Sequence, residues 1–232
     1  MLDNQTRLSE TAYQRIKRDI VLCALAPGES VSEARLAARY DMSKAPIRAG
    51  LARLCHEGLM SAVARRGYVV APITVRDVQE IFHMRLILEP AAARMAAGRL
   101  EESHILRIND TFSFPSSLAG EERDRLFLTK NKAFHLTVAE ASGNRRLAAA
   151  LSQLLDANER MLHLGIGKMG GADRFETEHR ELTDALLEND AEAAAALAHK
   201  QIKGGLGMVI DSILADPSVL DPGARDRETQ AV

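Results

Sequence analysis

The sequence has 232 residues, of which 46% are hydrophobic and 27% are charged, and its formal net charge is −2. This composition excludes a collagen-like or low-complexity chain and a disordered tail protein. Aromatic residues make up only 4% and Trp is absent, which favours a mainly α-helical protein with one large or two small domains. A charge of −2 speaks against nucleic-acid binding, because a protein that contacts phosphates needs a basic surface.

The charge is unevenly distributed along the chain. Residues 1–75 hold 11 Lys and Arg against 7 Asp and Glu, a net charge of +4, whereas residues 76–232 hold 19 against 25, a net charge of −6. The whole-chain value therefore conceals a modestly basic N-terminal part and an acidic C-terminal part. Because +4 is small, DNA affinity would depend on dimerisation and on the positions of particular cations more than on bulk charge.

Three further features concern the cellular setting. Cys23 and Cys55 fit neither a disulfide framework nor a Cys-x-x-Cys motif, so we expect bland buried thiols in a reducing compartment. The first ten residues lack the apolar segment of a signal peptide, and no apolar run approaches the ~18 residues of a membrane span. The sequence therefore predicts a soluble, cytoplasmic protein.

Short helical patterns and turn signals alternate over residues 1–74, which we expect to form the first domain. Three helices are predicted, over about residues 8–25, 32–40 and 43–57, with Ser32 as the expected N-cap of the second. The period then changes towards two and predicts strands at 59–63 and 68–71, joined by a tight basic turn. The order is therefore three helices followed by a β-hairpin.

The second and third predicted helices are separated by a turn of about three residues, which is helix-turn-helix spacing. Leu36, Ile47, Leu51 and Leu54 would pack this pair together. Five cations on these helices and the hairpin turn would converge on one surface: Arg35, Lys44, Arg48, Arg65 and Arg66. Arg suits bidentate contacts with guanine, and Lys suits guanine or phosphate, so the pattern predicts a recognition helix in the major groove and a wing beside it.

Residues 8–72 resemble the winged helix-turn-helix domain of the GntR family of bacterial transcription regulators. The matching motifs include Ser32-Glu33-x-x-Leu36-Ala37, Ser43-x-x-Pro46-Ile47-Arg48, Glu57-Gly58-Leu59 and Arg66-Gly67. The resemblance implies operator contacts at Arg35, Ser43, Lys44, Arg48 and Gly67, to which we add Ala45, Arg65 and Arg66. Lys44 stands where Arg is usual and Ala45 where Thr is usual, which would alter the preferred sequence or weaken one phosphate contact. A winged helix can also serve as a protein-interaction module.

Long helical patterns begin after Pro72 and predict an all-α six-helix bundle over residues 75–215, large enough to hold a central pocket. The helices are expected at about 75–98, 103–114, 121–142, 145–166, 174–188 and 191–214, with Asp190 as a cap for the last one. A polar tail, residues 216–232, is expected to be disordered.

Polar side chains on these helices suggest a site inside the bundle. Asn131 and His135 are four residues apart and share a helix face, and His179 opens another helix, so the three could meet. Imidazole suits Zn and other transition metals, although a single His is more often a surface or satisfied core residue. Arg85 lies in an otherwise apolar helix and needs an anionic partner, for which Glu89 and an effector carboxylate are equally good candidates.

Residues 76–205 resemble the FCD ligand-binding domain, the C-terminal partner in the FadR subgroup of GntR regulators, and six helices suit its VanR-like form. The similarity rests on Glu80-Ile81-x-x-x-Arg85-x-x-x-Glu89-Pro90, Phe134-His135, Ala141-Ser142-Gly143-Asn144 and Glu178-His179-x-x-Leu182. The resemblance implies a divalent metal, such as Zn or Ni, held by one Asp and three His, which helps to bind a small carboxylate effector. Here Asn131 stands where Asp is usual and Gln201 where the third His is usual, while His199 lies two residues earlier and faces elsewhere.

Two versions of this site remain open. Asn131, His135, His179 and Gln201 form a weak metal site completed by water or effector oxygens, or the same four groups bind the effector by hydrogen bonds without a metal. Two neutral amides in place of a carboxylate and an imidazole should lower metal affinity sharply, which slightly favours the second version. Arg85 completes the predicted effector-binding set.

The sequence thus predicts a homodimeric bacterial transcription regulator, not an enzyme, whose operator binding is controlled by a small effector, for which we expect a carboxylate. The family favours repression that the effector relieves. Two alternatives remain: a helical metal-dependent enzyme carrying a winged helix, and an architectural DNA binder that needs no ligand. Against the enzyme, the site lacks a second carboxylate beside the His pair to act as a general base.

Overall fold

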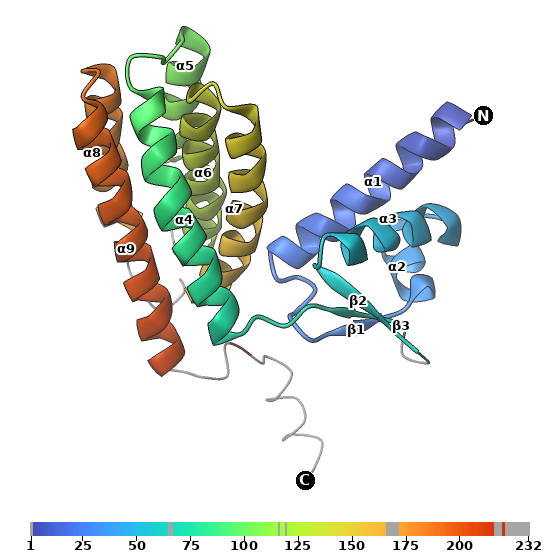
Figure 1. The fold of residues 1–232 in the computed structure, drawn as a ribbon. Helices are drawn as coiled ribbons and strands as arrows, with labels where there is room; N and C mark the ends of the chain where they lie inside the picture. The colour runs from blue at the N-terminus through green and yellow to red at the C-terminus, as the bar shows by residue number, and fades with distance from the viewer. Residues whose placement is uncertain are drawn as a thin grey trace. The chain divides into compact units, whose positions relative to one another are not determined.

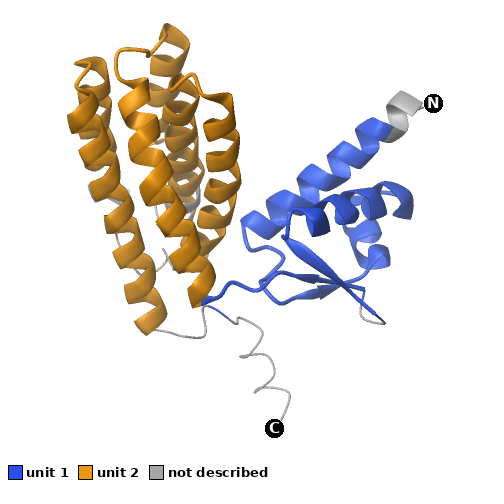
Figure 2. Cartoon of the chain, in the orientation of Figure 1, with its two compact units in different colours: residues 1–74, 217–232 blue, residues 75–216 orange. Residues whose placement is uncertain are grey.

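The computed structural model describes residues 2–64, 67–115, 117–118, 120–165, 172–215 and 220. Among these residues the chain forms two compact units, one within residues 1–74 and the other within residues 75–216 (Figure 2). Each unit has a hydrophobic core of its own. The predicted tail lies outside the described residues, apart from Leu220.

The first unit combines three helices with a small antiparallel sheet (Figure 1). Its elements are α1 (Leu2–Val21), β1 (Ser30–Val31), α2 (Glu33–Tyr40), α3 (Lys44–His56), β2 (Met60–Val63) and β3 (Gly67–Val70). The sheet order is β1-β3-β2, with Ser30 opposite Val69 and Ser61 also opposite Val69. The sequence predicted the hairpin β2–β3 but not β1, because two residues are too few to show a period of two.

Local capping and apolar spacing fix the helix-turn-helix. The Ser32 side chain accepts a hydrogen bond from the amide of Arg35 at 3.1 Å, so Ser32 is the N-cap of α2 as predicted. Asp41, with φ of 52°, ends that helix in the left-handed region. The side chains expected to join α2 and α3 are fully buried: Leu36, Ile47, Leu51 and Leu54. The first helix ends at Val21, earlier than predicted, and the chain turns at Cys23, which has φ of 54°.

The second unit is a bundle of six helices within the described ranges (Figure 1). They are α4 (Val75–Ala96), α5 (Glu102–Thr111), α6 (Gly120–Ala141), α7 (Arg145–Gly165), α8 (Ala172–Leu187) and α9 (Ala191–Ala215). The predicted fold class, a winged helix-turn-helix followed by a helical bundle, is confirmed. Asp190 caps α9 by accepting the amide of Ala193 at 2.9 Å, again as the sequence predicts.

The core of the bundle combines small, aliphatic and aromatic side chains. Ala93 and Ala96 of α4 and Ala194 of α9 are almost completely buried, so these helices approach closely. Phe134 of α6 is fully buried among them. No helix in the described part of the chain is both long and apolar enough to cross a membrane.

Candidate DNA-binding surface and effector pocket

The predicted DNA-binding residues of the first unit lie at the helix-turn-helix and at the start of the wing strand. Arg35 is in the first turn of α2, Ser43 precedes α3, Lys44 and Ala45 open α3, and Arg48 lies one turn later. Gly67 begins β3. Arg65 and Arg66, expected at the hairpin tip, lie outside the described residues.

Glycine is required at position 67 for two reasons. Its φ of 84° lies in the left-handed region that L side chains rarely adopt. A Cβ atom there would also come within 2.8 Å of the carbonyl oxygen of Val31 in β1. Gly67 therefore allows the wing strand to pass close to the residue that leads into α2.

The guanidinium of Arg48 is held by a carboxylate of the preceding helix. Its Nε and Nη2 donate to the two oxygens of Glu33 at 2.9 and 2.7 Å, a bidentate pair. The Tyr68 hydroxyl of β3 donates to the same carboxylate at 3.4 Å. The hydrogen bonds from Arg48 hold the pKa of Glu33 below its usual value. Glu33 thus links α2, α3 and the wing while the Arg48 side chain stays two-thirds exposed.

Arg35 has a similar acidic partner, since its Nη2 lies 2.8 Å from an oxygen of Glu29. The sequence motifs indicate the cations but not their pairing with these carboxylates. The Glu33 of the Ser32-Glu33 motif was a visible signal for one of them. In the free protein, two of the predicted DNA-contacting arginines are therefore oriented by exposed ion pairs.

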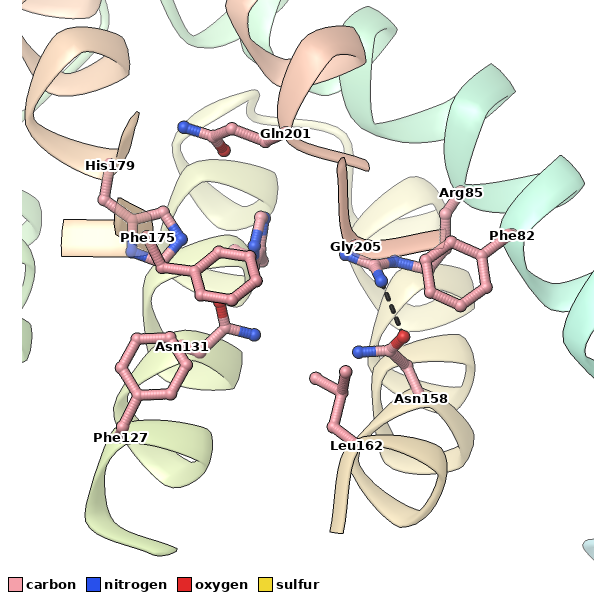
Figure 3. Close-up of a pocket in the computed structure, with 11 residues that line it drawn as sticks. Phe82, Arg85, Phe127, Asn131, Asn158, Leu162, Phe175, His179, Gln201 and Gly205 are labelled. Atoms are coloured by element: carbon pink, nitrogen blue, oxygen red, sulfur yellow. Dashed lines mark hydrogen bonds between the residues drawn. The ribbon is translucent and has the colours of Figure 1, made fainter. Parts of the chain in front are cut away.

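The second unit contains a pocket between its helices (Figure 3). Five of its helices contribute. The lining residues are Phe82, Arg85, Phe127, Asn131, His135, Asn158, Leu162, Phe175, His179, Gln201 and Gly205. All five side chains of the predicted effector-binding set line this one cavity. Asn158 and the three phenylalanines were not predicted.

A buried carboxylate organises one wall. One oxygen of Glu89 accepts a hydrogen bond from Nε of Arg85 at 2.5 Å. Its other oxygen lies 2.8 Å from Nδ1 of His135. Nη1 of Arg85 also donates to Oδ1 of Asn158 at 2.7 Å. Burial opposes the ionisation of Glu89, but the charges and hydrogen bonds of Arg85 and His135 outweigh it and lower its pKa to about 2. Glu89 is therefore the protein partner of Arg85, and this guanidinium still faces the pocket.

The opposite wall carries polar groups with few partners. His179 stacks on Phe134 with ring centroids 4.2 Å apart and meets His135 edge-on at 5.2 Å. Burial, followed by the nearby His135, lowers the pKa of His179 well below its usual value, so the ring is neutral at pH 7. Gln201 donates its Nε2 to the carbonyl of Glu178, and its buried Oε1 has no hydrogen-bond partner among the described residues.

The donor set does not suit a transition metal. Two imidazoles, His135 and His179, face the pocket, while Asn131 and Gln201 contribute neutral amides. In the described part of the chain, no three His, Cys, Asp or Glu side chains are grouped so that they could hold a metal ion. Glu89, the nearest carboxylate, already binds Arg85 and His135. We therefore derive no step through a metal.

A DNA-binding winged helix-turn-helix joined to a helical bundle with its own polar pocket defines a class of protein, the two-domain transcription regulators. The family model for bacterial regulatory proteins of the gntR family matches residues 8–70, and the FCD domain model matches residues 80–203. The chain belongs to the GntR family and carries an FCD domain. The predicted FadR-subgroup, VanR-like assignment fits this architecture.

Relatives cover most of the chain. The uncharacterized HTH-type transcriptional regulator YdhC of Bacillus subtilis is 28% identical over 205 residues, covering 85% of this chain and 90% of YdhC. The HTH-type transcriptional repressor RspR of Escherichia coli K12 is 24% identical, covering 80% and 82%. Since the family and these relatives are transcription regulators, the alternative of an enzyme is set aside.

Solved structures share the fold. That of McbR/YncC from E. coli has a TM-score of 0.75 at 19% identity, covering 88% of this chain and 97% of that one. A GntR transcriptional regulator from Rhodococcus sp. RHA1 has a TM-score of 0.73 at 20% identity, covering 89% and 99%.

Proposed function

We propose that this regulator binds a near-palindromic operator as a homodimer, through α3 and the wing, and that a small molecule in the pocket of the second unit controls its affinity for DNA. We further propose a carboxylate as part of that effector, and repression that the effector relieves. RspR and GlaR, two E. coli relatives, are named as repressors, which supports this sign.

The pocket is the observation that carries the ligand-controlled function. Buried polar groups are normally hydrogen-bonded, and an unsatisfied one costs about 1–3 kcal/mol. The Oε1 of Gln201 is buried without a partner in the described structure, in a cavity that Arg85, Asn131 and His179 also face. A ligand-independent architectural DNA binder has no use for such a cavity. A ligand that satisfies these groups would account for the cavity, and a ligand site distinct from the DNA-binding surface is what allosteric control requires.

The DNA-binding part of the proposal is tested with Arg48→Ala. An operator is first selected from random duplexes with the full-length protein. The variant should then bind this operator about 10- to 100-fold more weakly, the loss expected for one bidentate base contact. The fold should survive, because the Arg48 side chain is 66% exposed. Fluorescence anisotropy with labelled duplexes measures the affinity.

The matched control is Arg76→Ala, which removes another exposed, carboxylate-paired arginine, but from α4 of the other unit. Operator affinity should stay unchanged in that variant. The affinity of the wild type should also fall steeply with salt. If Arg48→Ala binds the operator as tightly as the wild type at physiological salt, the assignment of α3 as the recognition helix is wrong.

A further inference from the structure

The pocket has two chemically different ends. Their hydrogen-bonding groups indicate which functional groups the effector carries. Figure 3 shows Arg85 and Asn158 on one side, and His179, Asn131 and Gln201 on the other. The inference below rests on the proposed function, since it names the class of molecule that the pocket would bind.

The Arg85 end offers hydrogen-bond donors. The guanidinium uses Nε for Glu89 and Nη1 for Asn158, whereas its Nη2 donates to no residue in the described ranges. Asn158 accepts through Oδ1, so its Nδ2 remains a donor. A charged Nη2 beside an amide N–H is a site for a carboxylate.

The opposite end offers hydrogen-bond acceptors. Nδ1 of His135 lies 2.8 Å from Glu89, so the other ring nitrogen, Nε2, is on the side of the ring away from that carboxylate. The Nε2 of Gln201 donates to a backbone carbonyl, and its Oε1 remains as a buried acceptor. His179 is neutral and adds one further ring nitrogen. These acceptors favour a ligand that donates hydrogen bonds, as an N–H group does.

Charge balance narrows the ligand further. Arg85 and Glu89 form a buried pair of opposite charges, and both side chains are about 5% exposed. A bare carboxylate would add an uncompensated negative charge to this buried site, which is costly. A ligand that carries both an ammonium and a carboxylate adds none.

We propose that the effector is a small α-amino acid. Its carboxylate accepts from Nη2 of Arg85 and Nδ2 of Asn158, and its ammonium donates to Nε2 of His135 and Oε1 of Gln201. The guanidinium of Arg85 and the imidazole of His135 are bound to the two oxygens of one carboxylate, so both lie beside Glu89 in the pocket wall. The ligand side chain packs against the phenylalanines of the pocket. The ammonium occupies the position at which the family resemblance expects a metal.

Matched probes test this assignment on the full-length protein. The 20 standard L-amino acids are screened by thermal shift and by release of labelled operator, since a ligand of the folded state raises the melting temperature. Each amino acid that binds is compared with its deaminated acid, its 2-hydroxy acid and its decarboxylated amine. At least one amino acid should bind, and each analogue should bind at least 10-fold more weakly. Binding should be the same after dialysis against a chelator.

The outcomes separate the two proposals. Deaminated or hydroxy acids that bind as tightly, or amino acids that bind only with added Zn²⁺, overturn the amino-acid assignment and leave ligand control standing. If no probe of any class shifts the melting temperature or releases DNA, the amino-acid assignment and the ligand-controlled function both fail.

A variant tests the acceptor end. Gln201→Leu keeps the size of the side chain and removes Oε1, so the amino acid should bind at least 10-fold more weakly while the weak binding of its deaminated acid is unchanged. Ser212→Ala, a buried substitution on the same helix and outside the pocket lining, is the control and should alter neither. Equal losses for both ligands in Gln201→Leu would mean a general structural defect and would overturn the ammonium contact.

Discussion

At its proposed site, each unit pairs an arginine with a carboxylate, and the two pairs differ in their exposure to solvent. Arg48 and Glu33 of the first unit form a bidentate pair with the arginine 66% exposed, whereas the side chains of Arg85 and Glu89 in the second are both 5% exposed. Exposed pairs are worth little and exchange partners readily. A buried pair is fixed, because separating it strands a charge away from water.

This difference matches the two proposed tasks. An arginine that must meet DNA is held loosely by Glu33, which can be replaced by a base edge or a phosphate. An arginine that must shape a pocket is held on two sides by Glu89 and Asn158 and keeps one nitrogen for the ligand. The same chemical pair thus orients a side chain in one unit and fixes the electrostatics of a cavity in the other.

The largest effect is expected from Glu89→Gln. Removing the negative charge leaves Arg85 buried without a counter-ion, and breaking a buried pair in this way costs about 3–5 kcal/mol. Hydrogen–deuterium exchange of peptides from α4 and α6, followed in increasing urea, measures this in the second unit alone. Replacing both partners, as in Arg85→Met with Glu89→Leu, should recover most of the lost stability.

The control is Glu192→Gln, which breaks the exposed bidentate pair between Arg94 and Glu192 on the surface of the same unit. No measurable change in stability is expected there. Equal losses in the buried and the exposed variants would contradict the contrast drawn between the two environments.

The next effect concerns pH and His179. Its pKa is lowered in the folded state, so below the usual histidine value of about 6.5 the unfolded chain binds the proton more readily. The second unit should therefore lose stability as the pH falls from 7 to 5. Glu89, with a pKa of about 2, adds a loss only at more acidic pH, between about 4.5 and 2.

His179→Gln removes the ionisable group. It should reduce the change in stability of the second unit between pH 7 and 5, measured by the same exchange experiment. Its dependence below pH 4.5 should remain, because Glu89 is intact. A profile identical to that of the wild type between pH 7 and 5 would show that His179 is not the group responsible.

The sequence predicted what depends on neighbouring residues and motifs. Helix periodicity and caps such as Ser32 and Asp190 placed the helices, and the i to i+4 spacing of Asn131 and His135 placed both on one face. What it missed depends on residues far apart in the chain. Asn158 lies 73 residues from Arg85, and nothing in its surroundings in α7 marks it as a partner of that guanidinium.

In the helix-turn-helix too, the sequence predicted what depends on a local motif but not a contact between two helices. The cations of α2 and α3 follow from the motif, but the pairing of Arg48 with Glu33, 15 residues earlier, follows from how the two helices cross. The apolar residues that set this crossing were predicted. The relative placement of α2 and α3 that brings Glu33 to Arg48 can be seen only once the two helices are packed together.

The smallest effect is expected from Glu33→Gln, and it tests what the exposed pair does. Without the carboxylate, Arg48 loses the partner that orients it, which weakens operator binding, while the loss of a negative charge beside the DNA strengthens binding to any sequence. The ratio of operator affinity to random-duplex affinity should therefore fall about threefold, within the range of an exposed ion pair. Asp41→Asn, a charge change of the same size in the turn before α3, should strengthen binding to both duplexes alike and leave the ratio unchanged. A ratio that is also unchanged in Glu33→Gln would mean that Glu33 only neutralises Arg48 and does not orient it.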